Sequence, residues 1–154
     1  MNRFILTALL LFLPLVQSMA VSIESAYTRY YEDGEIRPIG QYFGASLIGQ
    51  GFRTVIASQP DKPKGQYFIA KLVNVDAGSA TSVKMTIFPS VGKDPMEFTL
   101  DISGESLRKW LYLGLTGSDW PDPEIQPMAW KIELLGPGDS LLAEWKSFLW
   151  EMPQ

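Results

Sequence analysis

Hydrophobic and polar residues alternate along short segments of this chain, and turn-forming residues separate the segments. Such alternation is typical of β-strands that bury one face, whereas an amphipathic helix would repeat every three to four residues. Pro38 withholds a backbone donor, so a strand that contains it is expected at a sheet edge. The pattern predicts strands at 21–31, 36–42, 52–58, 66–73, 82–88, 96–102, 129–135 and 141–150.

The leucines between 103 and 115 fit two structures. Leu107, Leu111 and Leu115 have helical spacing, but Leu111, Leu113 and Leu115 have strand spacing. The period of a short apolar run does not separate the two. We favour one helical turn over 104–109, followed by a strand over 110–115.

The last two predicted strands form a hairpin around the turn residues 136–140. Trp130, Ile132 and Leu134 would share one face of the first strand. Trp130 and Trp145 are therefore expected in the core, since a sandwich of this size needs large buried side chains. On the second strand the residues expected to share a face are Leu141, Ala143, Trp145 and Leu149.

Short strands separated by frequent turn signals, with no long helix after the first segment, predict an all-β fold. We expect an antiparallel, immunoglobulin-like β-sandwich of about eight strands. The chain has no cysteine, so it lacks the Cys–Trp–Cys core of antibody domains, and the prediction concerns architecture alone. An outer-membrane barrel is the structural alternative, which the short strands and the 11 prolines disfavour.

Residues 1–20 have the three parts of an export signal. Arg3 precedes an apolar run from Phe4 to Val16, and small residues stand at Ser18 and Ala20. The run is shorter than the roughly 18–20 residues that span a bilayer. We expect cleavage after Ala20, a single domain at 21–154, and a secreted or periplasmic location of the bacterial type. An uncleaved anchor or a buried first helix is the alternative.

Composition then restricts the chemistry. The 154 residues contain no His and no Cys, which excludes imidazole-based triads, thiol nucleophiles and zinc–thiolate sites. The net charge is −4, and residues 117–154 hold seven acidic residues against two lysines. An acidic segment repels nucleic acid and anionic membranes. We therefore expect no enzyme, no cofactor, no nucleic-acid partner and no membrane span after signal removal.

Asp119, Asp122 and Glu124 are the remaining candidates for chemistry. A hydrolase needs one carboxyl with a raised pKa, whereas three acids in an exposed, proline-rich loop all stay ionised. The same oxygens suit Ca²⁺, but their spacing does not follow the EF-hand pattern. A plain acidic loop at 117–124 is the simpler interpretation, and a hydrolase or a calcium site remains the alternative.

The aromatic residues point to recognition rather than catalysis. Trp120 lies between Asp119 and Pro121 in a polar loop, and loops on rigid sandwiches commonly carry binding residues. Trp150 ends a predicted strand that is apolar on both faces. Either this strand is fully buried, or it is an edge strand that a partner chain covers. We expect an exported, non-catalytic module that binds a protein partner or serves as an accessory of an envelope system. The alternative is a carbohydrate-binding module that stacks sugars on Trp110, Tyr112 and Trp120.

Overall fold

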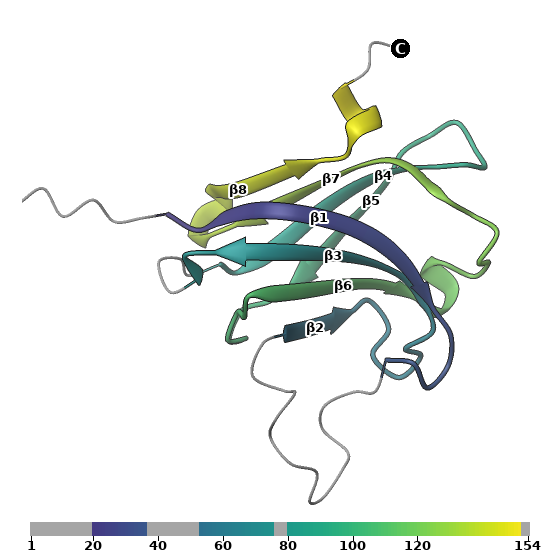
Figure 1. The fold of residues 1–154 in the computed structure, drawn as a ribbon, viewed down its shortest axis with the longest axis horizontal. Coiled ribbons are helices and arrows are strands. Elements are labelled where there is room, and N and C mark those ends of the chain that lie inside the picture. Colours follow the sequence, from purple (N-terminus) through teal and green to yellow (C-terminus); the bar gives the residue numbers. More distant parts are fainter. Residues whose placement is uncertain (1–19, 37–52, 76–79, 152–154) are drawn as a thin grey trace, which may run out of the picture.

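A computed structural model describes residues 20–36, 53–75 and 80–151. Eight strands in these ranges form two sheets of four strands each (Figure 1). The all-β, sandwich-like prediction is confirmed. The predicted signal segment, except Ala20, and the predicted edge strand at 36–42, except Ile36, lie outside the described residues. Sheet A contains, in spatial order, β1 (Ser22–Tyr31), β3 (Gly65–Val73), β6 (Trp110–Thr116) and β2 (Arg53–Ala57). Sheet B contains, in spatial order, β5 (Met96–Asp101), β4 (Ser82–Pro89), β7 (Pro127–Leu135) and β8 (Leu141–Lys146).

The strands pair antiparallel except at one edge of sheet A. There β2 runs parallel to β6, with Arg53 opposite Trp110 and Ala57 opposite Gly114. The prediction of a fully antiparallel fold is wrong at this strand. Parallel partners need a long connection, and β3, β4 and β5 lie between β2 and β6 in the chain.

The core lies between the sheets and is built from the alternate residues of each central strand. Phe68 of β3 occupies its middle: its ring meets Trp130 edge-on at 5.4 Å and Trp120 edge-on at 6.4 Å between centroids. The predicted core position of Trp130 is confirmed, and Trp145 packs against the same cluster. Each such ring buries roughly 150–250 Å² of surface, so these contacts contribute much of the stability. The other buried members include Ala70, Leu72, Val83, Met85, Ile87, Leu111, Leu113, Leu115, Ile132, Leu134 and Ala143.

The chain turns at residues 102–105, and residues 104–109 do not form the predicted helical turn. The N–H of Glu105 donates to the C=O of Ile102 at 3.0 Å, and Gly104 takes a positive φ of 83°. Just before β6, the carbonyl of Lys109 accepts from the N–H of Leu72 at 2.7 Å and so ties the chain to β3. The strand predicted at 110–115 is confirmed as β6.

The last strand ends earlier than its pattern predicts. β8 stops at Lys146, and the 3-10 helix η4 (Phe148–Glu151) follows. Ser147 causes the break: its N–H donates to the Trp130 carbonyl at 2.9 Å, while its hydroxyl accepts the Trp130 N–H at 2.9 Å. The side chain thus replaces the next ladder bond, and the strand prediction for 147–150 is wrong. Shorter 3-10 turns, η2 (Gly117–Asp119) and η3 (Pro137–Asp139), follow β6 and β7.

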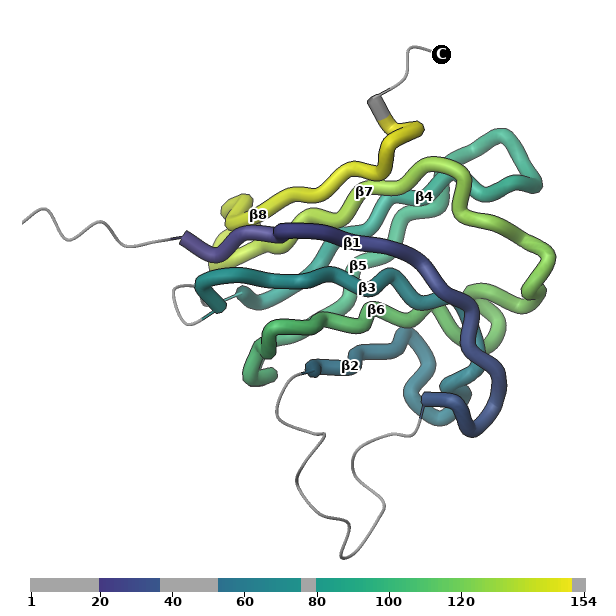
Figure 2. The backbone as a smooth tube through the Cα atoms, in the orientation of Figure 1, coloured from purple at the N-terminus to yellow at the C-terminus, as the bar shows by residue number. Residues whose placement is uncertain are grey.

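The two long sides of the sandwich differ. β1 and β8 lie side by side where the sheets approach each other, as the ribbon and the backbone trace both show (Figures 1 and 2). β2 and β5 are the opposite edges of their sheets. Within the described ranges no helix is both long and apolar enough to cross a bilayer.

Candidate functional site

The outer face of sheet A carries a second apolar cluster, separate from the core. Strand alternation places it there: Phe68 points into the sandwich, so Tyr67 and Ile69 point out. The strand registers then set Tyr27 beside Ile69, and Ile69 beside Tyr112. We call this surface the aromatic face; its outward side chains are Tyr27, Tyr31, Val55, Tyr67, Ile69, Trp110 and Tyr112.

Tyr67 is the fixed centre of the aromatic face. Its side chain is fully buried (0% exposed), although it lies outside the sandwich. Its hydroxyl donates to the Pro63 carbonyl at 2.8 Å, and Tyr31 meets its ring edge-on at 5.4 Å. Gly114 leaves room for the ring, because a Cβ there would lie 2.6 Å from it. Burial, with a smaller effect from Tyr31, raises the pKa of Tyr67 to about 12.

Around this centre the rings are partly open to solvent. Tyr27 is 48% exposed and meets Trp110 at 6.5 Å with an interplanar angle of 73°. Burial first, then the neighbouring Tyr112, raises the pKa of Tyr27 and of Tyr31 above the ordinary tyrosine value, so both hydroxyls are neutral at physiological pH. The face therefore offers rings and neutral hydroxyls together.

Two arginines lie against these rings. The Arg29 guanidinium carbon lies 4.6 Å from the centre of the Tyr31 ring, and that of Arg53 lies 5.8 Å from the centre of Tyr112. Both distances fall within the reach of cation–π attraction. The Nε of Arg53 is buried and has no hydrogen-bond partner among the described residues. Aromatic and arginine side chains held in this way are typical of protein-binding surfaces.

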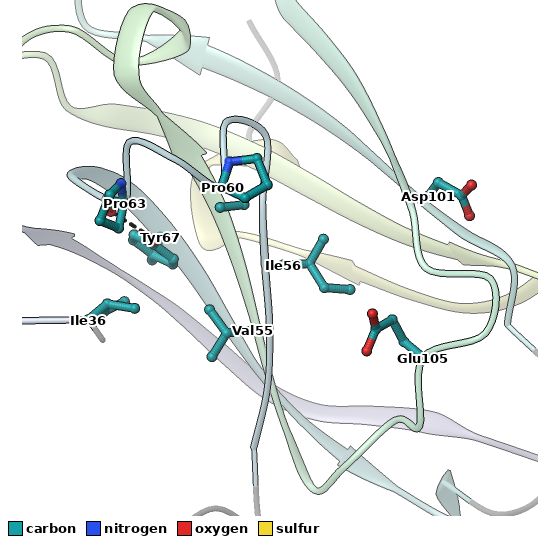
Figure 3. A pocket seen from close by; sticks show the side chains of 9 residues that line it. Ile36, Val55, Ile56, Pro60, Pro63, Tyr67, Asp101 and Glu105 are labelled. Atoms are coloured by element: carbon teal, nitrogen blue, oxygen red, sulfur yellow. Dashed lines mark hydrogen bonds between the residues drawn. The ribbon is translucent and has the colours of Figure 1, made fainter. Parts of the chain in front are cut away.

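A cavity of about 390 Å³ adjoins the aromatic face at strand β2 (Figure 3). Val55 and Ile56 project to opposite sides of the strand, and both line the cavity. Tyr67 and Pro63 lie on the Val55 side, whereas two carboxylates lie on the other. Among the described residues, the lining consists of Ile36, Val55, Ile56, Ala57, Pro60, Pro63, Tyr67, Asp101 and Glu105.

The structure separates the residues predicted to form a stacking platform. Trp110 and Tyr112 lie on the aromatic face, but Trp120 is buried in the core (1% exposed). Its indole N–H donates to the Ile125 carbonyl at 3.2 Å, because the segment after η2 folds back over the end of the core. The prediction of Trp120 as an exposed binding residue is wrong.

Trp150 and the acidic residues lie away from the aromatic face. Trp150 packs on Phe88 at 5.6 Å, with the Lys131 ammonium 5.5 Å from its ring centre, so it belongs to the sheet B side. Asp122 accepts the N–H of Glu124 at 2.8 Å and so shapes its own turn. Asp119 lies in η2. The part of the chain that the structure describes contains no cluster of three acids able to hold a metal ion.

Sequence reasoning missed Tyr27, Tyr31 and Tyr67 as members of the aromatic face. A signal was present: Tyr27, Arg29 and Tyr31 occupy alternate positions of one strand and so share its outer face. No family model, no curated protein and no solved structure matches this chain, and its function is therefore inferred from the geometry alone.

Proposed function

We propose that the chain is an exported, non-catalytic binding module that recognises a protein partner through the aromatic face. One observation carries the proposal: partly exposed rings pack against one another on the outside of sheet A, where they do not contribute to the core between the sheets. Contiguous apolar surface of this kind marks interaction sites in soluble proteins. The composition of residues 1–20 supports export, and burial of Val21 in the core supports a domain that begins there.

The strand order supports an immunoglobulin-like sandwich. With β2 set aside, sheet A has the order β1-β3-β6 and sheet B the order β5-β4-β7-β8. If the seven remaining strands are lettered A, B, C, C′, E, F and G in chain order, the sheets have the orders A-B-E and C′-C-F-G. These orders agree with the arrangement of immunoglobulin-like domains. β2 then takes the position beside strand E that strand D has in constant domains, but it runs parallel to its neighbour.

Ring orientation favours a protein over a glycan. A sugar platform needs exposed rings in one plane, whereas Tyr27 and Trp110 meet at 73° and Tyr31 and Tyr67 at 89°. Edge-to-face packing sets the rings of Tyr27 and Trp110 out of a common plane, so these two exposed rings form no flat platform. A carbohydrate-binding module remains the second candidate, because Trp110 and Tyr112 are still partly exposed on one face.

Capture of partners by the immobilised 21–154 domain tests the proposal. The Y27A/W110A variant should lose partners that the wild type retains from envelope extract and culture medium. The matched control is K84A/E97A, which removes an ion pair from the outer face of sheet B and should bind like the wild type. Equal capture by both variants would show that the aromatic face is not the site. Binding on a glycan array without protein capture would favour the carbohydrate alternative.

A further inference from the structure

One edge of β2 has backbone groups that no described strand pairs. The N–H of Ser58 donates to the Gly114 carbonyl at 2.8 Å, so the chain at Ser58 directs its donor toward β6. Main-chain groups alternate in direction along a strand, which turns the N–H and C=O of Val55 and Ala57 away from β6. Among the described residues, β2 is the last strand of sheet A on that side.

The cavity beside β2 runs along this unpaired edge. It is lined by Val55 and Ala57 from the outer face of the strand and by Ile56 from the inner face. A single cavity can reach both faces of β2 only by passing around one of its edges. One edge of β2 is hydrogen-bonded to β6, so the cavity passes around the other, unpaired edge. Figure 3 shows the same arrangement, with β2 running between the two groups of lining side chains.

The two halves of the cavity differ in character. Ile36, Pro63 and Tyr67 make the half beside Val55 apolar, whereas Asp101 and Glu105 lie beyond Ile56. The hydroxyl and N–H of Ser103 both donate to Asp101 and lower its pKa, which keeps it ionised at neutral pH. Neither carboxylate forms an ion pair with a described residue.

We propose that an extended segment of a protein partner adds to the β2 edge as a fifth strand of sheet A. Strand side chains alternate between faces, so the segment would place apolar residues beside Val55 and Tyr67 and basic residues beside Asp101 and Glu105. Charge complementarity with the two carboxylates selects a basic segment over an acidic one. The inference rests on the proposed protein-binding function and names the kind of segment that the partner supplies.

Short peptides of fixed pattern test the proposal directly. An eight-residue peptide that alternates valine and lysine should bind the 21–154 domain in calorimetry and shift the amide NMR signals of Val55 and Ala57. The matched peptide of valine and glutamate should bind at least tenfold more weakly. N-methylation of alternate amides blocks one edge of the peptide: one methylated set should abolish binding and the complementary set should not. Equal binding by all of these peptides, or by none, would overturn the proposal.

Variants of the domain separate this inference from the proposed function. Glu105→Gln should weaken the valine–lysine peptide by about tenfold and leave the fold unchanged, since Glu105 is exposed. Val55→Pro removes an edge-directed donor, and proline is tolerated at sheet edges. It should abolish peptide binding, and should V55P fail to fold, E105Q and the methylated peptides still decide the question. Partner capture lost in Y27A/W110A but retained in both E105Q and V55P would refute the fifth strand and leave the aromatic face as the site.

Discussion

The outer faces of the two sheets have opposite character, although both sheets have four strands and share one core. Sheet A presents rings over most of its outer face, whereas sheet B presents lysines and glutamates along β4, β7 and β8, with Phe88 and Trp150 packed together at one end. Three ion pairs cover the strands of sheet B: Lys84 with Glu97 at 3.6 Å, Lys131 with Glu133 at 3.0 Å, and Lys146 with Glu144 at 2.9 Å.

This difference shows that apolar side chains have two separate roles in the molecule. Ion pairs near the surface contribute roughly 0–1 kcal/mol each and keep their face hydrated, so a partner gains little by covering it. Tyr67 and Ile69 are as buried as the core residues, yet they lie outside the sandwich. Their neighbours Tyr27 and Trp110 remain partly exposed, and covering them with a partner would release water from apolar surface.

The largest effect should come from truncating the centre of the aromatic face. Tyr67→Ala should lower the free energy of unfolding by about 3–5 kcal/mol, because it removes a fully buried ring and leaves a cavity. The matched change on sheet B is Thr86→Ala, an outward and buried position beside Lys131, which should cost about 1 kcal/mol or less. Urea unfolding measures both, and equal losses would contradict the asymmetry of the two faces.

The Tyr67 hydroxyl should make stability fall at alkaline pH. Its pKa is about 12 in the fold and 10.0 as the ordinary value, so between these values the unfolded chain binds fewer protons and unfolding becomes easier as pH rises. The stabilisation by the neutral, buried hydroxyl is fully present below pH 10. Its loss should lower the free energy of unfolding by about 2–3 kcal/mol by pH 12. Tyr67→Phe should flatten this slope in urea titrations at successive pH values. An unchanged slope would show that the hydroxyl is not protected from solvent.

Strand alternation gave most of the fold but could not assign the faces of β3. Tyr67, Phe68 and Ile69 are consecutive and all fully buried, so period 2 does not say which of them enters the core. The answer depends on the partner strands, because a Trp opposes Phe68 while Gly114 accommodates Tyr67. The pairing register of neighbouring strands therefore decides which side chains form the aromatic face. The sequence of a single strand does not specify that register.

The predictions for Trp120 and for residues 147–150 were wrong for a related reason. The polar neighbours Asp119 and Pro121 indicate a loop, and the chain is a loop there, but its path folds back over Phe68 and buries the indole. Ser147 ends β8 through bonds to Trp130, a residue 17 positions earlier. Long-range contacts decided both outcomes, while Trp130 was predictable because its own strand alternates cleanly.

A substitution at Gly114 should lower the free energy of unfolding by less than the loss of the Tyr67 ring does. Gly114→Ala places a methyl group against the Tyr67 ring, which is held by its bond to Pro63, and should cost about 1–2 kcal/mol. In the Tyr67→Ala background the ring is gone and only the contact with the Thr116 methyl group at 3.1 Å remains, so the same change should cost much less. A double-mutant cycle by urea unfolding measures this coupling. Additive losses would mean that the ring does not rest on β6.

The smallest effect should come from the charged face. Glu133→Gln breaks the pair with Lys131, but Glu133 also lies directly across from Glu144, so the lost attraction is partly offset by relief of repulsion. We expect a loss of about 0.5 kcal/mol or less, and 1 M salt should remove it because the screening length there is about 3 Å. The cost of Tyr67→Ala should persist in 1 M salt, because burial of a ring does not depend on charge. A Glu133→Gln loss that is large and independent of salt would mean that the outer face of sheet B contributes to stability as the aromatic face does. The contrast that supports the proposed binding face on sheet A would then be lost.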